Sequence, residues 1–381
     1  MPGTAWAGMV RDVLNNKRIA DRPVVDVIDE KLVDALALGC AVYGAGGGGN
    51  VETGSWAAKH ALEQHGPTAL VGLAELDDDD LILPLHAIGA PTVSQEMLPS
   101  GEEPGLIRDE IERVFGRPVA ALMAGEIGGA NGVRSAGWAA ALGVPLLDAD
   151  GMGRAFPEID MVSMELASIV PSVIVVADVQ GNVVTCRPVS GPWAERLARA
   201  VCVASGSTAL MTSYVMTARE ARGAVIEGSV SAAVRVGELL LAGGCSVADL
   251  CVHLGATRLI VGKIVELERE DAGGWVRGSV VVSGAGEDRG RLVRLEIQNE
   301  NLVALEDGRA VATVPDPIVV LDADTARALG TDTLQFGQRV AVVAWPCHPL
   351  WRTPAGLAKT GPAAFGYDID YRPIEQLSAP I

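Results

Sequence analysis

The sequence predicts an α/β fold: an N-terminal three-layer α/β domain with a mostly parallel sheet, and a C-terminal region that contains a small β-barrel. Two observations support this prediction. Strand-like and helix-like segments alternate through the first half of the chain, which is typical of a mostly parallel sheet covered by helices. Between residues 258 and 343, short strand-like runs are separated by turns, a spacing that is typical of a small barrel or sandwich.

The chain has 381 residues, which is enough for two domains at about 150 residues each. The change in pattern places the boundary near residue 168, giving an α/β domain over residues 1–168 and a C-terminal region over residues 169–381. The segment from Gly361 to Tyr371 holds one of the four phenylalanines and two of the four tyrosines. Because buried rings stabilise a fold, we expect this tail to dock back on the body.

Local patterns predict the elements of the first part in order. Helical spacing of apolar residues predicts helices at residues 29–43, 53–64, 102–115 and 133–142. Short apolar runs predict strands at residues 68–74, 81–88, 119–124 and 144–147. The last strand, helix and strand of this series form one βαβ unit, so the ends of these two strands should open on the same edge of the sheet.

The second part begins with a predicted hairpin. The turn Gln180-Gly181-Asn182 lies between strand-like runs at residues 173–177 and 183–187. Two helices are expected next, at residues 193–203 and 230–241. The β-rich segment that follows predicts short strands at residues 259–268, 274–283, 291–297, 302–305 and 318–321.

The composition excludes several classes of protein. Hydrophobic residues make up 49% of the chain and charged residues 20%, which is typical of a folded, soluble protein. The net charge of −18 repels phosphate backbones and anionic membranes, so we expect neither a nucleic-acid partner nor a membrane. The six cysteines are scattered without a C-x-x-C pair, which favours a reduced, cytoplasmic setting and argues against structural zinc.

A glycine-rich loop is the most informative local feature. Five of the six residues from Gly44 to Gly49 are glycine, and a helix is expected to begin just beyond them. Exposed backbone N–H groups in such a loop form a nest for a negatively charged or carbonyl group. The alternative is a tight connector between two helices. As substrate-binding residues we predict Gly46, Gly47, Gly48 and Gly49.

The loop also matches the G-x-G-x-x-G pattern of dinucleotide-binding proteins, but its context does not. The segment before it has helical rather than strand-like spacing, whereas a dinucleotide fingerprint follows a strand. No G-x-x-x-x-G-K-[ST] element is present either. We therefore expect no nucleotide cofactor.

Polar side chains follow two neighbouring strands of the predicted sheet. Glu126 comes just after the strand that ends at Ala124, and Asp148 and Asp150 come just after the strand that ends at Leu147. Paired carboxyl groups in a partly dehydrated cleft acquire separate pKa values and can act as general acid and base, so we predict these three as catalytic residues. From the same loops, the predicted substrate-binding residues are Asn131 and Arg154.

Two other roles for these carboxyl groups stay open. They can ligate a divalent metal ion, so the sequence leaves the need for a metal undecided. Asp148 or Asp150 can also simply cap a turn. The pair Cys347-His348 suggests a nucleophile and its base, although adjacent side chains on an extended chain point in opposite directions.

Seven motifs together carry a resemblance to a known family: Gly44–Gly49, Gly89-Ala90-Pro91, Glu126–Asn131, Asp148–Glu158, Gln298–Asn301, Ala312–Asp316 and Gly361–Asp368. Spread over about Val27 to Tyr371, they resemble the S-methyl thiohydantoin desulfurase family. The resemblance implies an N-terminal α/β domain, a C-terminal part with a β-barrel, and hydrolytic replacement of sulfur on, or opening of, a five-membered thiohydantoin or hydantoin-like ring.

Such a reaction defines what the site must supply. Water attacks an amidine-like ring carbon and sulfur leaves as hydrogen sulfide or a thiol, which requires a base, an acid and donors for the developing negative charge. We expect the strand-end carboxyl groups to supply the base and the acid, and the N–H groups of the glycine loop to supply the donors. The alternative is a non-catalytic subunit or module that recognises a hydantoin-like small molecule for a partner enzyme. A homo-oligomer is also left open.

Overall fold

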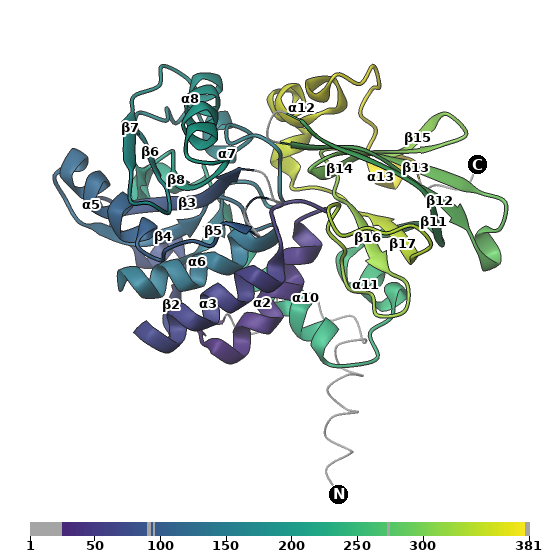
Figure 1. The fold of residues 1–381 in the computed structure, drawn as a ribbon, viewed down its shortest axis with the longest axis horizontal. Helices are drawn as coiled ribbons and strands as arrows, with labels where there is room; N and C mark the ends of the chain where they lie inside the picture. The colour runs from purple at the N-terminus through teal and green to yellow at the C-terminus, as the bar shows by residue number, and fades with distance from the viewer. Residues whose placement is uncertain (1–24, 90–92, 94–95, 273–274, 378–381) are drawn as a thin grey trace, which may run out of the picture.

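The computed structural model describes residues 25–89, 93, 96–272 and 275–377. Two β-sheets form two lobes that lie side by side (Figure 1). The first lobe combines helices with a sheet whose centre is parallel, and the second is built on an antiparallel sheet. The predicted fold class is confirmed.

The first sheet has ten strands in the order β1-β2-β5-β4-β3-β8-β6-β7, with β10 beside β5 and β9 beside β3. Among the described residues up to 168, the pairings β2–β5, β5–β4 and β4–β3 are parallel, and β1–β2 is antiparallel. The strands are β1 (Val27–Ile28), β2 (Thr68–Val71), β3 (Leu81–Gly89), β4 (Val119–Ala124), β5 (Leu146–Asp150), β6 (Ile174–Ala177), β7 (Val183–Cys186), β8 (Thr208–Thr212), β9 (Met216–Thr217) and β10 (Ile226–Glu227).

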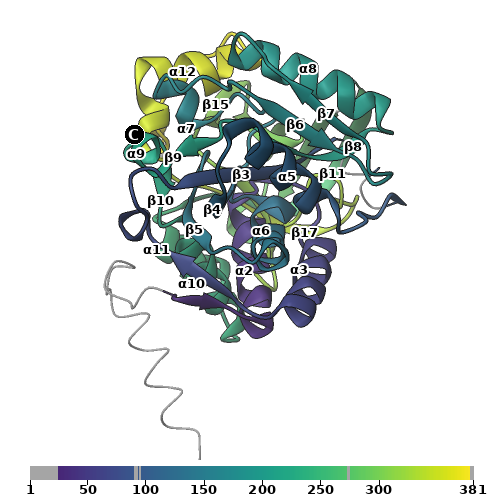
Figure 2. The same cartoon turned by 90° about the vertical axis from the view of Figure 1, so that its left-hand side faces the viewer.

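Helices cover both faces of this sheet. On one face α6 packs on β4, α10 on β5 and α5 on β6, and α2 and α3 pack against α6; on the other, α8 packs on β3 and β6. Figure 2 shows α8 and α2 on opposite sides of β3. The helices are α2 (Glu30–Tyr43), α3 (Val51–His65), α5 (Glu103–Phe115), α6 (Gly129–Leu142), α7 (Ser163–Leu166), α8 (Gly191–Ala204), α9 (Ala218–Ala221), α10 (Ser229–Leu241) and α11 (Val247–Leu254).

The second sheet has seven strands in the order β15-β14-β13-β12-β11-β17-β16, and every pairing is antiparallel. Strands β14 and β16 are distant in this order yet contact each other, because the sheet curls into a half-barrel. The strands are β11 (Thr257–Ala272), β12 (Trp275–Gly284), β13 (Leu292–Gln298), β14 (Glu300–Glu306), β15 (Arg309–Thr313), β16 (Ile318–Asp322) and β17 (Arg339–Ala344).

The C-terminal segment lies against the second lobe through apolar contacts and through hydrogen bonds to one buried carboxylate. Asp316 accepts hydrogen bonds from Tyr371 Oη at 3.0 Å and from the backbone N of Ile374 at 2.9 Å. Two short helices belong to this segment, α12 (Pro354–Thr360) and α13 (Ile374–Leu377). The strands of the first sheet come from both sides of residue 168 and extend to residue 227. The sheet therefore does not divide at residue 168, and the domain boundary there stays a prediction.

Strand β5 differs from its prediction in a way that changes the site. Predicted to end at residue 147, it runs from Leu146 to Asp150. Its C-terminal end pairs with β10, with Ile226 opposite Asp150. That partner comes from a segment about 75 residues further along the chain, which no local pattern reveals. Asp148 therefore lies inside a buried strand rather than in a loop after it.

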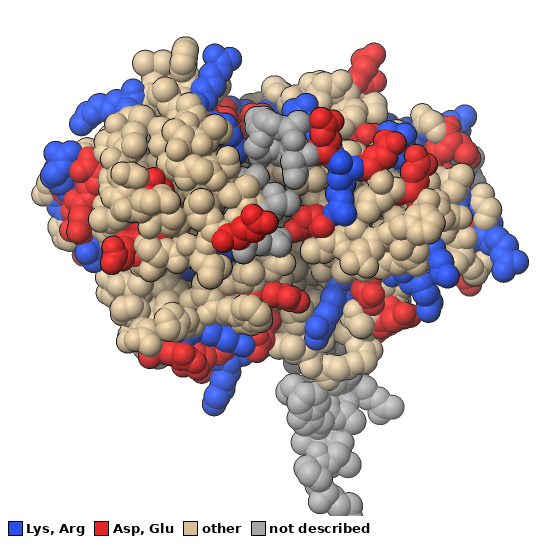
Figure 3. Space-filling model, in the orientation of Figure 1, with Lys and Arg blue, Asp and Glu red and all other residues tan. Residues whose placement is uncertain are grey.

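Within the described ranges, no helix combines the length and the apolar character that crossing a bilayer demands. On the face drawn in Figure 3, acidic and basic side chains are interspersed over both lobes.

Candidate active site

The glycine loop packs directly against the first turn of α6. Gly48 and Gly49 have φ angles of +76° and +86°, which side-chain-bearing residues rarely adopt. A Cβ on Gly48 would overlap the carbonyl oxygen of Gly128, and a Cβ on Gly129 would overlap Gly48. The two backbones therefore touch with no side chain between them, which brings the N-terminal ends of α3 and α6 together.

The second sheet holds the other half of the same loop. Asn301 donates from its backbone N and from Nδ2 to the carbonyl oxygen of Ala45, at 2.9 Å and 3.0 Å. Thr331 donates from its backbone N to the carbonyl oxygen of Gly46 at 2.9 Å. A Cβ on Gly47 would overlap Glu300 Oε1. Gly46 and Gly47 thus lie against the second lobe.

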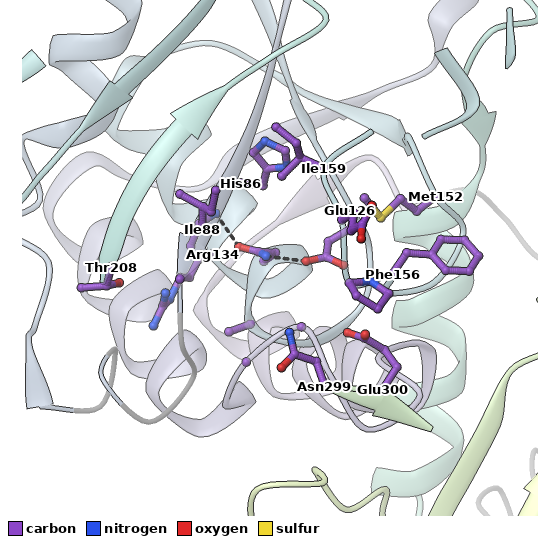
Figure 4. Close-up of a pocket in the computed structure, with 18 of the residues that line it drawn as sticks. His86, Ile88, Glu126, Arg134, Met152, Phe156, Ile159, Thr208, Asn299 and Glu300 are labelled. Carbon is purple, nitrogen blue, oxygen red and sulfur yellow. Dashed lines mark hydrogen bonds between the residues drawn. The ribbon is translucent and has the colours of Figure 1, made fainter. Parts of the chain in front are cut away.

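A pocket opens where these parts meet, at the carboxyl ends of β3 and β4 (Figure 4). This is where open α/β sheets bind ligands. The predicted residues that line it are Gly48, Gly49, Glu126 and Asn131. Other lining residues come from β3, α6, α8, the turn after β5 and the turn from β13 into β14, including His86, Arg134, Met152, Phe156, Glu158, Arg199, Asn299 and Glu300.

Glu126 has one oxygen anchored and one without a partner. Asn131 Nδ2 donates to Glu126 Oε1 at 2.5 Å, and Asn131 Oδ1 in turn accepts from the backbone N of Ala87 at 2.8 Å. Glu126 Oε2 is buried and has no hydrogen-bond partner among the described residues. Burial raises the pKa of Glu126 to about 8, although the hydrogen bond from Asn131 opposes this shift.

Glu300 is the second carboxyl group in the pocket, and it comes from the other lobe. It is the first residue of β14 and is only 2% exposed. Burial and then the nearby charge of Glu126 raise the pKa of Glu300 well above its usual range. Its Oε2 also has no partner within the described part of the chain. Two buried, mutually repelling carboxyl groups therefore face one pocket, and they hold at least one proton at neutral pH.

Asp150 and Asp148 do not line this pocket. Asp150 Oδ2 accepts from the backbone N of Ile127, Met152 and Gly153 at 2.9, 3.0 and 2.8 Å. It thereby ties the turn that carries Glu126 to the turn after β5. Burial raises the pKa of Asp150 to about 6. Asp148 accepts from Ser231 at the start of α10, from its backbone N at 2.9 Å and its hydroxyl at 2.6 Å.

Arg154 is buried just outside the pocket lining. It donates to the carbonyl oxygens of Ala155 and Pro315 at 2.9 Å and 3.0 Å, and its guanidinium lies 4.7 Å from the ring centre of Phe156. Burial lowers its pKa to about 10, although the nearby carboxylates, Glu300 foremost, oppose this shift. Arg154 is thus placed to offset negative charge on the carboxyl pair.

The remaining chemical candidates have different positions. His86 lines the pocket, and burial followed by the charge of Arg199 lowers its pKa to about 4, which keeps the imidazole neutral. Cys347 does not line the pocket, and burial raises the pKa of its thiol to about 12. Over the described residues, no three side chains of His, Cys, Asp or Glu are grouped so as to hold a metal ion.

Sequence reasoning missed Glu300, His86, Arg134 and Arg199. The one signal for Glu300 was its place in the motif Gln298–Asn301, four polar residues inside a β-rich segment. Arg134 carries a weaker signal. It lies three residues after Asn131, and residues at this spacing share one face of a helix.

The fold and the pocket together define an α/β protein with a pocket between two lobes, lined by two buried carboxyl groups. The chain belongs to the S-methyl thiohydantoin desulfurase family: the model of the S-Me-THD-like N-terminal domain matches residues 31–188, and that of the S-Me-THD-like C-terminal domain matches residues 189–374. These two matches join at residue 188, in the turn between β7 and α8.

Other comparisons add support for the fold alone. The chain is similar to the crystal structure of a structural-genomics target protein from Chromobacterium violaceum. The two are 22% identical with a TM-score of 0.78, over 92% of this chain and 100% of that chain. A search of curated proteins gave no match.

Proposed function

We propose that this protein is a hydrolase that replaces sulfur on a thiohydantoin-like ring, with Glu126 and Glu300 as its acid–base pair. Family membership suggests the thiohydantoin ring and the sulfur. The observation that carries the catalytic part is the pair itself. Each of these two buried carboxyl groups has an oxygen without a partner among the described residues, and both line one pocket.

In the singly protonated pair, one carboxyl group acts as the base and the other as the acid. Asn131 donates a hydrogen bond to Glu126 and so favours its ionised form, while the charge of Glu126 favours the protonated form of Glu300. Glu126 is then the base that takes a proton from the attacking water. Glu300 is the acid that gives its proton to sulfur. A C–O bond forms at the ring carbon, the C–S bond breaks, and a thiol or hydrogen sulfide leaves.

The other predicted residues support this pair in our proposal. Gly48 and Gly49 bring backbone groups to the pocket. Gly46 and Gly47 shape the contact between the lobes. Asp148, Asp150 and Arg154 act as positioning residues, because each is held by the surrounding backbone or by Ser231 and none of the three lines the pocket.

The alternative, a non-catalytic module that binds a hydantoin-like ring, fits the pocket less well. Burying a carboxyl group costs free energy unless its oxygens are paired. Recognition of a neutral ring needs hydrogen-bond donors and acceptors, whereas two unpaired acids side by side serve proton transfer. The carboxyl pair therefore favours the enzyme over the module.

The direct test is to incubate purified protein with S-methyl thiohydantoin, thiohydantoin and hydantoin. Loss of the ultraviolet absorbance of the ring and release of thiol or sulfide report turnover. We expect kcat/KM for the sulfur compounds to rise with pH up to about 8, because Glu126 must lose its proton and its pKa is raised to about 8. Binding of the ring without any sulfur release would favour the module instead.

A further inference from the structure

Arg134 is a half-buried cation that forms no ion pair with the described residues. It lies on α6 and lines the pocket, and its Nε is buried with no hydrogen-bond partner among the described residues. Burial lowers its pKa, and no carboxylate opposes that shift. The chain carries 48 acidic residues against 30 basic ones. A guanidinium whose Nε is buried without a partner among the described residues is therefore unexpected here, since burying a polar group without a hydrogen bond is costly.

Arg199, the second arginine of the pocket, has a partner of opposite charge within the protein. Arg199 donates from Nε to Glu195 Oε1 at 2.8 Å and forms an ion pair with the same carboxylate. It thus arrives at the pocket already paired. Arg134 differs in having no such partner in the described structure, so its charge is available to a ligand.

The position of Arg134 relative to the carboxyl pair sets the size of that ligand. Asn131, which holds Glu126, lies three residues before Arg134 on the same helix. One helical turn, about 5 Å along the axis, separates these two positions. Figure 4 shows Arg134 and Thr208 at one end of the pocket and Glu126 and Glu300 at the other. The pocket is therefore cationic at one end and acidic at the other.

We propose that Arg134 binds a carboxylate carried on a short side chain of the substrate ring, while the ring carbon that bears sulfur lies at Glu126 and Glu300. This inference rests on the proposed function for the identity of the ring. A guanidinium presents paired N–H donors that match the two oxygens of a carboxylate. The same contact would keep negative substituents away from the acidic end and so fix the orientation of the ring.

Paired substrates test this directly. Two thiohydantoins with the same ring and sulfur are compared, one with a carboxyethyl side chain and one with the corresponding neutral amide. We expect the wild-type kcat/KM to favour the carboxylate by about 10²-fold, and Arg134→Met to remove most of this preference by raising KM for the carboxylate. Arg134→Lys should restore part of the preference.

Two further measurements test the carboxylate site even if Arg134→Met changes the stability or the activity of the protein in general. Because Arg134→Met removes a half-buried group whose Nε has no partner among the described residues, its melting temperature should equal or exceed that of the wild type. Glutarate, a short dicarboxylate, should bind the wild type in calorimetry and bind Arg134→Met at least tenfold more weakly. The exposed Arg113 on α5, changed to Gln, provides the matched control.

The results that would contradict the carboxylate site differ from those that would contradict the proposed function. Equal kcat/KM for the two substrates in the wild type, or an equal loss for both in Arg134→Met, would overturn the carboxylate site while desulfuration stands. Glutarate binding that is unchanged in Arg134→Met would overturn it as well. Absence of sulfur release from every ring, together with Arg134-dependent glutarate binding, would instead overturn the proposed reaction and retain the anion site.

Discussion

Glu126 and Asp150 are buried carboxyl groups at the ends of neighbouring strands of one sheet, yet their surroundings differ. Three backbone N–H groups converge on one oxygen of Asp150, which lies outside the pocket lining. Glu126 takes one side-chain hydrogen bond, from Asn131, and has an unpartnered oxygen in the pocket. Although Asp150 Oδ1 is also unpartnered in the described structure, only Glu126 can offer its oxygen to a ligand. Burial alone does not distinguish a scaffold acid from a reactive one; access to a cavity does.

The largest expected effect is on catalysis at Glu126. Changing Glu126 to Gln keeps its shape and its contact with Asn131 but removes the base, so kcat should fall by about 10³-fold. The rate of sulfur release at saturating substrate measures this. Glu63→Gln, on the exposed side of α3, is the control and should match the wild type. Turnover in Glu126→Gln within tenfold of the wild type would place the base elsewhere.

In contrast to Glu126, changing Asp150 should lower the stability of the protein more than its activity. Changing Asp150 to Ala leaves three buried N–H groups without their acceptor, which should cost about 3 kcal/mol of unfolding free energy or more. Denaturant unfolding measures the loss. At a temperature where the variant stays folded, kcat should fall less than in Glu126→Gln. A stable but inactive Asp150→Ala protein would make Asp150 a catalytic residue after all.

A smaller effect concerns pH and stability. The pKa of Glu126 is raised to about 8 from an ordinary value of 4.5, so its protonated form stabilises the fold below pH about 4.5, and this contribution is lost as pH rises through about 8. The glutamine in Glu126→Gln cannot ionise. The unfolding free energy of this variant, relative to the wild type, should therefore increase between pH about 5 and pH about 8, by at most about 1.4 kcal/mol per pH unit. Parallel unfolding curves with a pH-independent difference would show that Glu126 is not perturbed.

The fold was predictable from local patterns wherever neighbours in the chain decide it. The strand at residues 119–124 has its predicted bounds, and α2 matches the helical spacing seen before the glycine loop. The end of β5 was not predictable, because its partner β10 lies far along the chain. The register of a strand depends on such pairing as much as on its own residues.

The site was predictable only on the side that the first lobe supplies. Glu126, Asn131 and the glycine loop follow from the rule that ligands bind at the carboxyl ends of parallel strands. Glu300 is one glutamate in a β-rich segment, and only the docking of the second lobe on Gly47 brings it to the pocket. Arg134 was missed for a similar reason, since the absence of a partner is a property of the folded structure.

The most direct test of the central claim, that Glu126 and Glu300 act as one pair, is the kcat of Glu126→Gln, Glu300→Gln and the double variant on the same thiohydantoin. Groups that act as a unit give losses that do not multiply. The account predicts a loss of about 10²-fold or more in each single variant, and a double variant within about threefold of the slower one. Losses that multiply in the double variant, or a Glu300→Gln protein as active as the wild type, would contradict it.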